Sequence, residues 1–96
     1  MANNNSDKRV IRGVVIGGSG NGQKLGLRTA NLDIGLAAGM KKGLYGCEIS
    51  IDNKSYRGLL FFGLNSLTKK DALEVHIFKF SDNIYRKVIE VTINKY

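Results

Sequence analysis

Apolar and polar side chains alternate along several short segments of this chain, which is the pattern of half-buried β-strands. The clearest example is GLYGCEISI at 43–51, where the alternate positions from Tyr45 to Ile51 are all apolar. Turn-forming residues at 52–54 connect it to SYRGLLFF at 55–62. Because so short a turn separates the two segments, the pattern predicts a β-hairpin.

Three more segments are predicted to be strands. The first, RVIRGVVI at 9–16, is rich in β-branched residues, and the last, 88–93, has an apolar side chain at every second position. The segment 72–80 has an apolar face formed by alternate residues from 73 to 77, whereas Glu74, His76 and Phe78 lie on the other face. Each segment is therefore expected to bury one face in a common core.

The rest of the chain shows little periodicity, and the predicted fold is all-β. We expect extended or irregular structure at 25–36, one helical turn at most within 37–42, and a loop at 63–71. Five or so short strands with short connections favour a small closed antiparallel barrel, because closure removes exposed sheet edges. Residues 1–8 are predicted to be a disordered tail and 9–96 the folded domain. Most aromatic residues are expected in the core, with one or two lining a flat ligand: Tyr45, Tyr56, Phe61, Phe62, Phe78, Phe80 and Tyr85.

The composition bounds the class of protein. With 96 residues and 43% hydrophobic residues, the chain has enough apolar surface for one core, and no apolar run is long enough to predict a membrane span. The start lacks the apolar stretch of a secretory signal, and Cys47, the single cysteine, is expected to be a small buried hydrophobe. A cytoplasmic location is the resulting expectation. A monomer is the default expectation for the assembly.

The net charge of +7 favours phosphate-bearing partners of some kind. It arises from 15 Lys and Arg against 8 Asp and Glu, and the basic residues are spread along the chain rather than gathered in one block. A spread of this kind is more typical of a solvated surface than of a nucleic-acid interface.

A glycine-rich loop follows the first predicted strand and is a candidate phosphate site. Backbone N–H groups exposed by glycines form a concavity suited to anions. Glycine-rich loops are also ordinary strand connections, and neither the P-loop nor the dinucleotide-binding pattern is present. The candidate phosphate-binding residues are Gly17, Gly18, Gly20, Gly22 and Lys24.

Thr29 and Asn31 follow the loop and offer a hydroxyl and a carboxamide oxygen two residues apart. On an extended segment both side chains lie on the same side. Two neutral oxygens beside bound phosphates suit Mg²⁺, which keeps water and phosphate oxygens as its other ligands. We therefore predict that these two residues bind nucleotide and metal.

Glu74 is the candidate general base, because a carboxylate held on a strand can accept a proton from an alcohol. The alternative is that Glu74 and His76 form the solvent face of an edge strand, and the pattern alone favours this alternative. A zinc site is not expected, since His76 has no Cys or second His at ligand spacing.

The order of these segments resembles the riboflavin kinase (flavokinase) domain, which in bacteria is commonly fused to an FMN adenylyltransferase. The matching motifs are G-x-V-V-x-G, the glycine loop, L-G-x-x-T-A-N-L, G-L-Y, the hairpin, L-E-V-H-I-F-x-F and D-x-I-Y. The similarity covers 11–94, and the joint occurrence of T-A-N-L and L-E-V-H is its most specific part.

The resemblance implies a six-stranded, Greek-key-like β-barrel that transfers the γ-phosphoryl group of ATP to the 5′-hydroxyl of riboflavin, giving FMN. It also implies Mg²⁺ as the metal. In that family the residues that match Gly17 to Gly22 and Lys24 border the nucleotide phosphates. Those matching Thr29 and Asn31 hold Mg²⁺ and phosphate oxygens, and the one matching Glu74 is the presumed base.

This sequence departs from the family at four places. Arg28 stands where the family has Pro, 63–67 lacks the Arg, Pro and Thr of the family's flavin loop, and Arg86 follows Tyr85 where the family has Gly. The chain ends at Tyr96, before the arginine-bearing segment and helix expected on the flavin side, and FAD synthesis is not expected. A non-catalytic flavin or nucleotide-binding module, a partner chain that completes the flavin site, and a basic nucleic-acid-binding barrel therefore remain alternatives.

Overall fold

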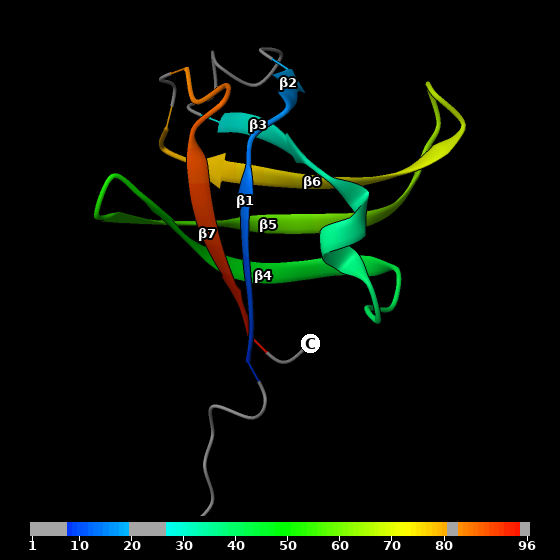
Figure 1. Cartoon of the computed structure of the whole chain (residues 1–96), viewed down its shortest axis with the longest axis horizontal. Helices are drawn as coiled ribbons and strands as arrows, with labels where there is room; N and C mark the ends of the chain where they lie inside the picture. The colour runs from blue at the N-terminus through cyan, green and yellow to red at the C-terminus, as the bar shows by residue number, and fades with distance from the viewer. Residues whose placement is uncertain (1–7, 20–26, 81–82, 95–96) are drawn as a thin grey trace, which may run out of the picture.

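The computed structural model describes residues 8–19, 27–80 and 83–94. Within these ranges every strand pairing is antiparallel, and the strands form one curled sheet of order β1-β7-β4-β5-β6-β3-β2 (Figure 1). The elements are β1 (Arg9–Val14), β2 (Gly17–Ser19), β3 (Leu27–Leu32), the 3₁₀-helix η3 (Ile34–Ala37), β4 (Gly43–Ile51), β5 (Lys54–Asn65), β6 (Lys70–Phe78) and β7 (Val88–Ile93).

The two ends of the sheet order, β1 and β2, are consecutive along the chain and are joined by Val15 and Ile16. The Val15 N–H donates to the Lys87 carbonyl at 2.9 Å on the β7 side, and the Ile16 N–H donates to the Asn31 carbonyl at 2.9 Å on the β3 side. One bent stretch therefore closes the sheet into a barrel of six strands. β7 lies beside β4 in the β4-β5-β6 meander, which is a Greek-key order, so the predicted fold class is confirmed.

The alternation seen in the sequence is the division between core and surface. On β6, Leu73, Val75 and Ile77 are at most 1% exposed, and the intervening side chains point outward. Fully burying one such aliphatic side chain stabilises the fold by roughly 1.5–3 kcal/mol. Further strongly buried aliphatic residues come from the inward faces of the other strands: Ile11, Leu32, Ile49, Ile51, Leu60, Ile89, Val91 and Ile93.

The β4–β5 hairpin forms where the sequence predicts it. Asp52 and Asn53 both have positive φ, at 51° and 67°, and they form a two-residue turn between Ile51 and Lys54. Two positive φ values in a two-residue loop are the geometry of a type I′ turn, whose twist matches that of the flanking strands.

Three local expectations differ from the structure. The single helical turn begins at Ile34 rather than Ala37, because the Asp33 side chain accepts a hydrogen bond from the Gly35 N–H at 2.8 Å and caps it. The loop expected at 63–71 is shorter, since β5 and β6 extend to Asn65 and Lys70. Gly17–Ser19 pairs with β3 as a strand instead of starting a loop. No helix within the described ranges is long and apolar enough to cross a membrane.

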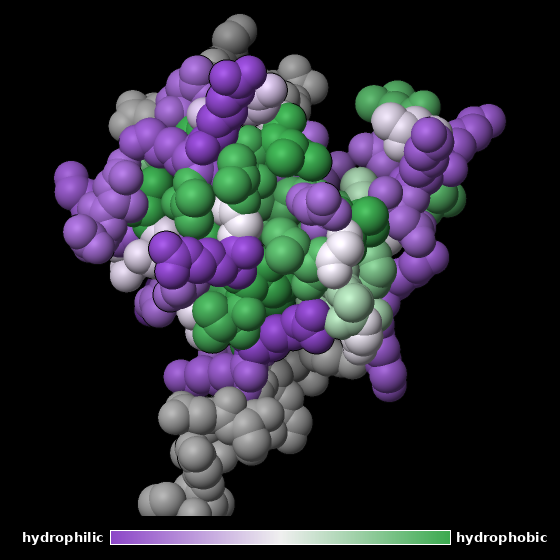
Figure 2. Space-filling view, in the orientation of Figure 1, coloured by the Kyte–Doolittle hydropathy of each residue, from purple (hydrophilic) through white to green (hydrophobic). Residues whose placement is uncertain are grey.

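Most of the aromatic residues pack in or against the core, as expected. Tyr45 and Phe80 are buried, and Tyr56 and Phe62 pack against the core from its edge. Phe78 and Tyr85 are the exceptions, at 42% and 52% exposed. Phe78 shares the outer face of β6 with Glu74, and Tyr85 lies in the turn before β7. The face of the barrel seen in Figure 2 carries apolar residues surrounded by hydrophilic ones. Tyr56, Phe61 and Phe62 are half-buried.

Candidate functional site

The pairing of β3 with β6 brings together residues from distant parts of the sequence. Thr29 lies opposite His76, and Asn31 lies opposite Glu74. The intervening residue Ala30 is fully buried, so these four side chains share the outer face of the barrel. The structure therefore places the candidate metal ligands and the candidate base side by side.

Glu74 is held by its neighbours and lies on a central strand. β6 has β5 on one side and β3 on the other, so the interpretation of Glu74 and His76 as the face of an edge strand is wrong. The Glu74 side chain is only 18% exposed. Its Oε2 accepts a hydrogen bond from Asn65 Nδ2 at 3.1 Å, and its Oε1 lies 3.6 Å from His76 Nε2.

Asn65 is a site residue that sequence reasoning missed. Its Oδ1 accepts hydrogen bonds from the backbone N–H groups of Leu67 at 2.8 Å and Thr68 at 3.3 Å, which caps the turn between β5 and β6. The carboxamide oxygen is thereby occupied, and the Nδ2 group is left to face Glu74. An Asn that starts a turn is visible in a sequence, but its contact with Glu74 depends on the β5–β6 register.

His76 joins the two halves of the site. Its Nδ1 lies 3.0 Å from Thr29 Oγ1, within hydrogen-bond distance, and its side chain is 28% exposed. A continuous series of contacts therefore runs from Thr29 through His76 and Glu74 to Asn65.

Of the candidate phosphate-binding glycines, Gly17 and Gly18 lie within the described residues. Gly17 lies opposite Asn31, and a Cβ at Gly17 would be 3.6 Å from Asn31 Nδ2, an ordinary contact. Gly18 lies opposite Ala30 in the same ladder. The candidate residues Gly20, Gly22 and Lys24 lie outside the described residues.

Two hollows open at neighbouring positions of β3. The first, here called the Thr29 hollow, has a volume of about 280 Å³ and is lined by Gly17, Arg28, Thr29 and Tyr85 among others. The second, the Glu74 hollow, has a volume of about 390 Å³, and its polar lining residues are Asn31, Asp33, Asn65, Thr68, Asp71 and Glu74. Thr29 and Asn31 are two residues apart on one face, so the candidate metal ligands are divided between adjoining hollows.

The donor set limits which metal fits. Among the described residues, no group of three or more His, Cys, Asp or Glu side chains is arranged to hold a metal ion. Thr29 and Asn31 supply neutral oxygens, and these fit a cation that takes most of its ligands from water and phosphate, as Mg²⁺ does.

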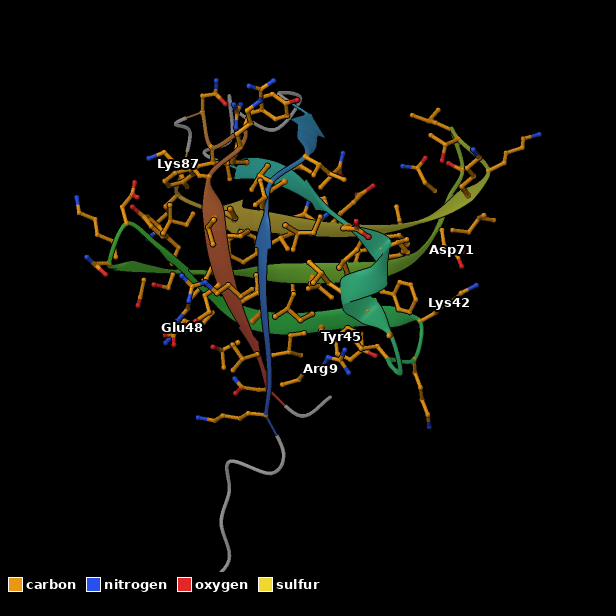
Figure 3. All side chains as sticks on the ribbon, in the orientation of Figure 1. Arg9, Lys42, Tyr45, Glu48, Asp71 and Lys87 are labelled. Atoms are coloured by element: carbon orange, nitrogen blue, oxygen red, sulfur yellow. The ribbon has the colours of Figure 1, made fainter. Side chains whose placement is uncertain are left out.

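An ion pair borders the Glu74 hollow. Lys42 Nζ lies 3.0 Å from Asp71 Oδ2 and connects the segment before β4 to the start of β6 (Figure 3). Asp71 is therefore partly neutralised. Asp33 is likewise engaged, as the cap of η3.

Cys47 lies apart from the site and is buried in the core, as predicted. Burial raises the pKa of its thiol from 9.0 to about 11. The thiol is therefore protonated and unreactive near neutral pH.

Comparison with known proteins gives one family. Residues 6–96 match the riboflavin kinase (flavokinase) family. The chain is 38% identical over 90 residues to a bifunctional riboflavin kinase/FMN adenylyltransferase from Buchnera aphidicola, covering 88% of this chain and 29% of that protein. It is 36% identical over 90 residues to the trifunctional protein RibF/MnmA of Mycoplasmoides gallisepticum, covering 90% of this chain and 14% of that protein.

Two further similar proteins carry other names. The RNA-binding riboflavin kinase RibR of Bacillus subtilis is 31% identical over 87 residues, covering 88% of this chain and 37% of that protein. A crystal structure titled macrolide-efflux protein from Streptococcus pneumoniae superimposes with a TM-score of 0.64 at 26% identity, covering 90% of this chain and 29% of that one. The chain thus spans well under half the length of the relatives it matches.

Proposed function

Because this chain belongs to the riboflavin kinase family, we propose that it transfers the γ-phosphoryl group of ATP to the 5′-hydroxyl of riboflavin, giving FMN and ADP. The observation that carries this proposal is the pairing of Asn31 with Glu74 across β3 and β6. It supports a site where a hydroxyl group and a phosphate meet within reach of one carboxylate.

Riboflavin is the substrate of the Glu74 hollow. The Glu74 carboxylate accepts the proton of the 5′-hydroxyl while that oxygen bonds to the γ-phosphorus and the bond to ADP breaks. A carboxylate has about four lone-pair positions, and only one hydrogen bond, from Asn65, occupies them among the described residues. Glu74 therefore keeps acceptor capacity for the substrate. The contact with Asn65 fixes the direction of the carboxylate.

ATP is the substrate of the Thr29 hollow, where Arg28 is the cation that supports phosphate binding. Its side chain is half-buried, and no described Asp or Glu forms an ion pair with it. A guanidinium without a competing carboxylate is suited to phosphate oxygens. Gly17 and Gly18 lie beside β3, and by family resemblance Gly20, Gly22 and Lys24 border the same phosphates.

Thr29 and Asn31 would hold Mg²⁺ together with phosphate oxygens and water. When bound, the metal neutralises charge on the phosphates and makes the transferred group more electrophilic. The residues of the chain orient the two substrates on either side of this pair.

Product analysis tests the proposal. The purified chain is incubated with riboflavin, ATP and Mg²⁺, and the flavins are separated by chromatography. We expect FMN to form in proportion to ADP. If no FMN forms with ATP or another triphosphate, the proposal is wrong, and saturable quenching of riboflavin fluorescence would then indicate a non-catalytic flavin-binding module.

RNA binding is a second candidate function, favoured by the net charge of +7 and by the similarity to the RNA-binding riboflavin kinase of Bacillus subtilis. Binding through phosphate contacts releases counterions, so affinity for an oligonucleotide should fall steeply with salt. Failure to retain any oligonucleotide on the chain at low salt would remove this candidate.

A further inference from the structure

His76 stands between two groups that the proposed reaction uses for different substrates. Its Nδ1 is 3.0 Å from Thr29 Oγ1, on the nucleotide side, and its Nε2 is 3.6 Å from Glu74 Oε1, on the riboflavin side. The first distance is that of a hydrogen bond, whereas the second is too long for one and describes an electrostatic contact.

The backbone of His76 is held in place by a glycine on the neighbouring strand. A Cβ at Gly58 would lie 2.1 Å from the His76 carbonyl oxygen and 2.8 Å from Ile49 Cδ1. β5 therefore approaches β6 at His76 as only glycine permits. The imidazole is thus attached to a position that has little freedom to shift.

The two contacts determine which ring nitrogen carries the proton. A neutral imidazole has one N–H group and one nitrogen lone pair. A carboxylate oxygen beside Nε2 favours the N–H there and repels a lone pair. Nδ1 is then the acceptor, and the Thr29 hydroxyl must be the donor in the 3.0 Å hydrogen bond.

The direction of this hydrogen bond matters for the nucleotide side. A free hydroxyl group rotates, and its proton can point at an incoming cation and repel it. With its proton given to Nδ1, Thr29 Oγ1 keeps its lone pairs for the Mg²⁺ and phosphate side of the Thr29 hollow. We propose that His76 is a positioning residue that orients the Thr29 hydroxyl for MgATP. The proposal rests on the proposed function for the identity of that ligand.

Two substitutions distinguish the roles of the two ring nitrogens of His76. The side-chain amide of asparagine lies near the δ position of a histidine, so His76→Asn keeps an acceptor for Thr29. The amide of glutamine lies near the ε position, so His76→Gln leaves the hydroxyl without its acceptor. We expect His76→Gln to weaken MgATP binding about tenfold, which is roughly the effect of losing one hydrogen bond. His76→Asn should keep most of the parent's affinity.

Calorimetric titration with MgATP measures this effect without turnover. Thr29→Val, which removes the hydroxyl, should weaken binding at least as much as His76→Gln, and combining the two should add little. The KM for riboflavin should stay unchanged in His76→Gln. Equal MgATP affinity in the parent, His76→Asn and His76→Gln chains would overturn the proposal.

Nitrogen NMR tests the proton position directly. His76 is the single histidine of the chain, so protein labelled with ¹⁵N-histidine and freed of any affinity tag shows one imidazole. In the neutral form of the imidazole, we expect the proton on Nε2 and a lone pair on Nδ1. A proton on Nδ1 would overturn the proposal.

The two hypotheses fail in different ways. If no FMN forms but His76→Gln weakens MgATP binding and the proton is on Nε2, the riboflavin kinase proposal fails and the role of His76 stands. If FMN forms but the substitutions leave MgATP binding unchanged, the role of His76 fails alone. Absence of MgATP binding by the parent chain would overturn both.

Discussion

Glu48 and Glu74 are two glutamates on the outer face of the same sheet, and only one lies in a candidate site. Both are on central strands, β4 and β6. Glu48 is exposed and lies opposite Arg57 and Thr92, at the far end of the sheet from Asp71, which borders the Glu74 hollow (Figure 3). Within the described part of the chain its carboxylate has no hydrogen bond or ion pair.

The difference lies in the neighbours rather than in the size of the hollow. Glu48 lines a hollow of about 670 Å³, larger than the 390 Å³ around Glu74. The Glu74 carboxylate, however, is fixed by Asn65 and lies beside His76. A general base must be held within reach of its substrate, and this requirement distinguishes the two positions.

Substitution of the two glutamates should give the largest contrast. Glu74→Gln is expected to lower kcat for FMN formation at least a hundredfold, roughly the contribution of a general base, since the amide cannot accept the hydroxyl proton. Glu48→Gln should leave kcat unchanged. Both rates follow from chromatographic measurement of FMN. A Glu74→Gln chain with the parent's rate would refute the base assignment.

Two glycines test the scaffold under the site. Gly58→Ala should lower the free energy of unfolding by about 3 kcal/mol, because the added Cβ would lie 2.1 Å from the His76 carbonyl oxygen. Gly46→Ala is the matched control, since a Cβ there meets nothing within 4 Å. Urea denaturation followed by circular dichroism measures both. Equal urea midpoints for the two variants would show that β5 and β6 are not close enough at Gly58 to exclude a Cβ.

Asn65→Asp tests the group that holds Glu74. The aspartate keeps an oxygen for the turn N–H groups of Leu67 and Thr68 but loses the Nδ2 donor that lies 3.1 Å from Glu74. We expect kcat to fall about tenfold with the fold retained. The KM for ATP should stay unchanged, because Asn65 lines the Glu74 hollow and not the Thr29 hollow. A kcat equal to the parent's would contradict the role of this contact.

Arg28→Gln should give a smaller effect, confined to the nucleotide. Loss of one guanidinium from the Thr29 hollow is expected to raise the KM for ATP severalfold and to leave the KM for riboflavin unchanged. Arg57→Gln, an exposed arginine opposite Glu48, is the control for the loss of one positive charge. If both variants raise the KM for ATP equally, the effect is one of net charge and Arg28 has no specific role.

The sequence predicted the fold well wherever side chains alternate. The inward faces of β4, β6 and β7 follow directly from this alternation. The hairpin turn at Asp52 and Asn53 follows from the turn-forming residues there. β2 was missed because Gly17 and Gly18 have no side chains to form a pattern, and its strand conformation depends on pairing with β3.

The candidate site was only partly visible in the sequence. Thr29, Asn31 and Glu74 were chosen from their chemistry, and the structure brings them to one face, while their roles stay predictions. Asn65 was missed because its contact with Glu74 depends on the register of two strands. The alternation put Phe78 on the same face of β6 as Glu74 and His76, and the structure places it there.

Titration of MgATP into the Glu74→Gln chain tests the central claim most directly, namely that one carboxylate acts on riboflavin beside a separate nucleotide site. If Glu74 is a base and not a ligand of the nucleotide-bound cation, MgATP affinity should stay within about threefold of the parent, a difference below 1 kcal/mol, while FMN formation is lost. A fall in MgATP affinity that matches the loss of turnover would contradict the claim and make Glu74 part of the nucleotide site.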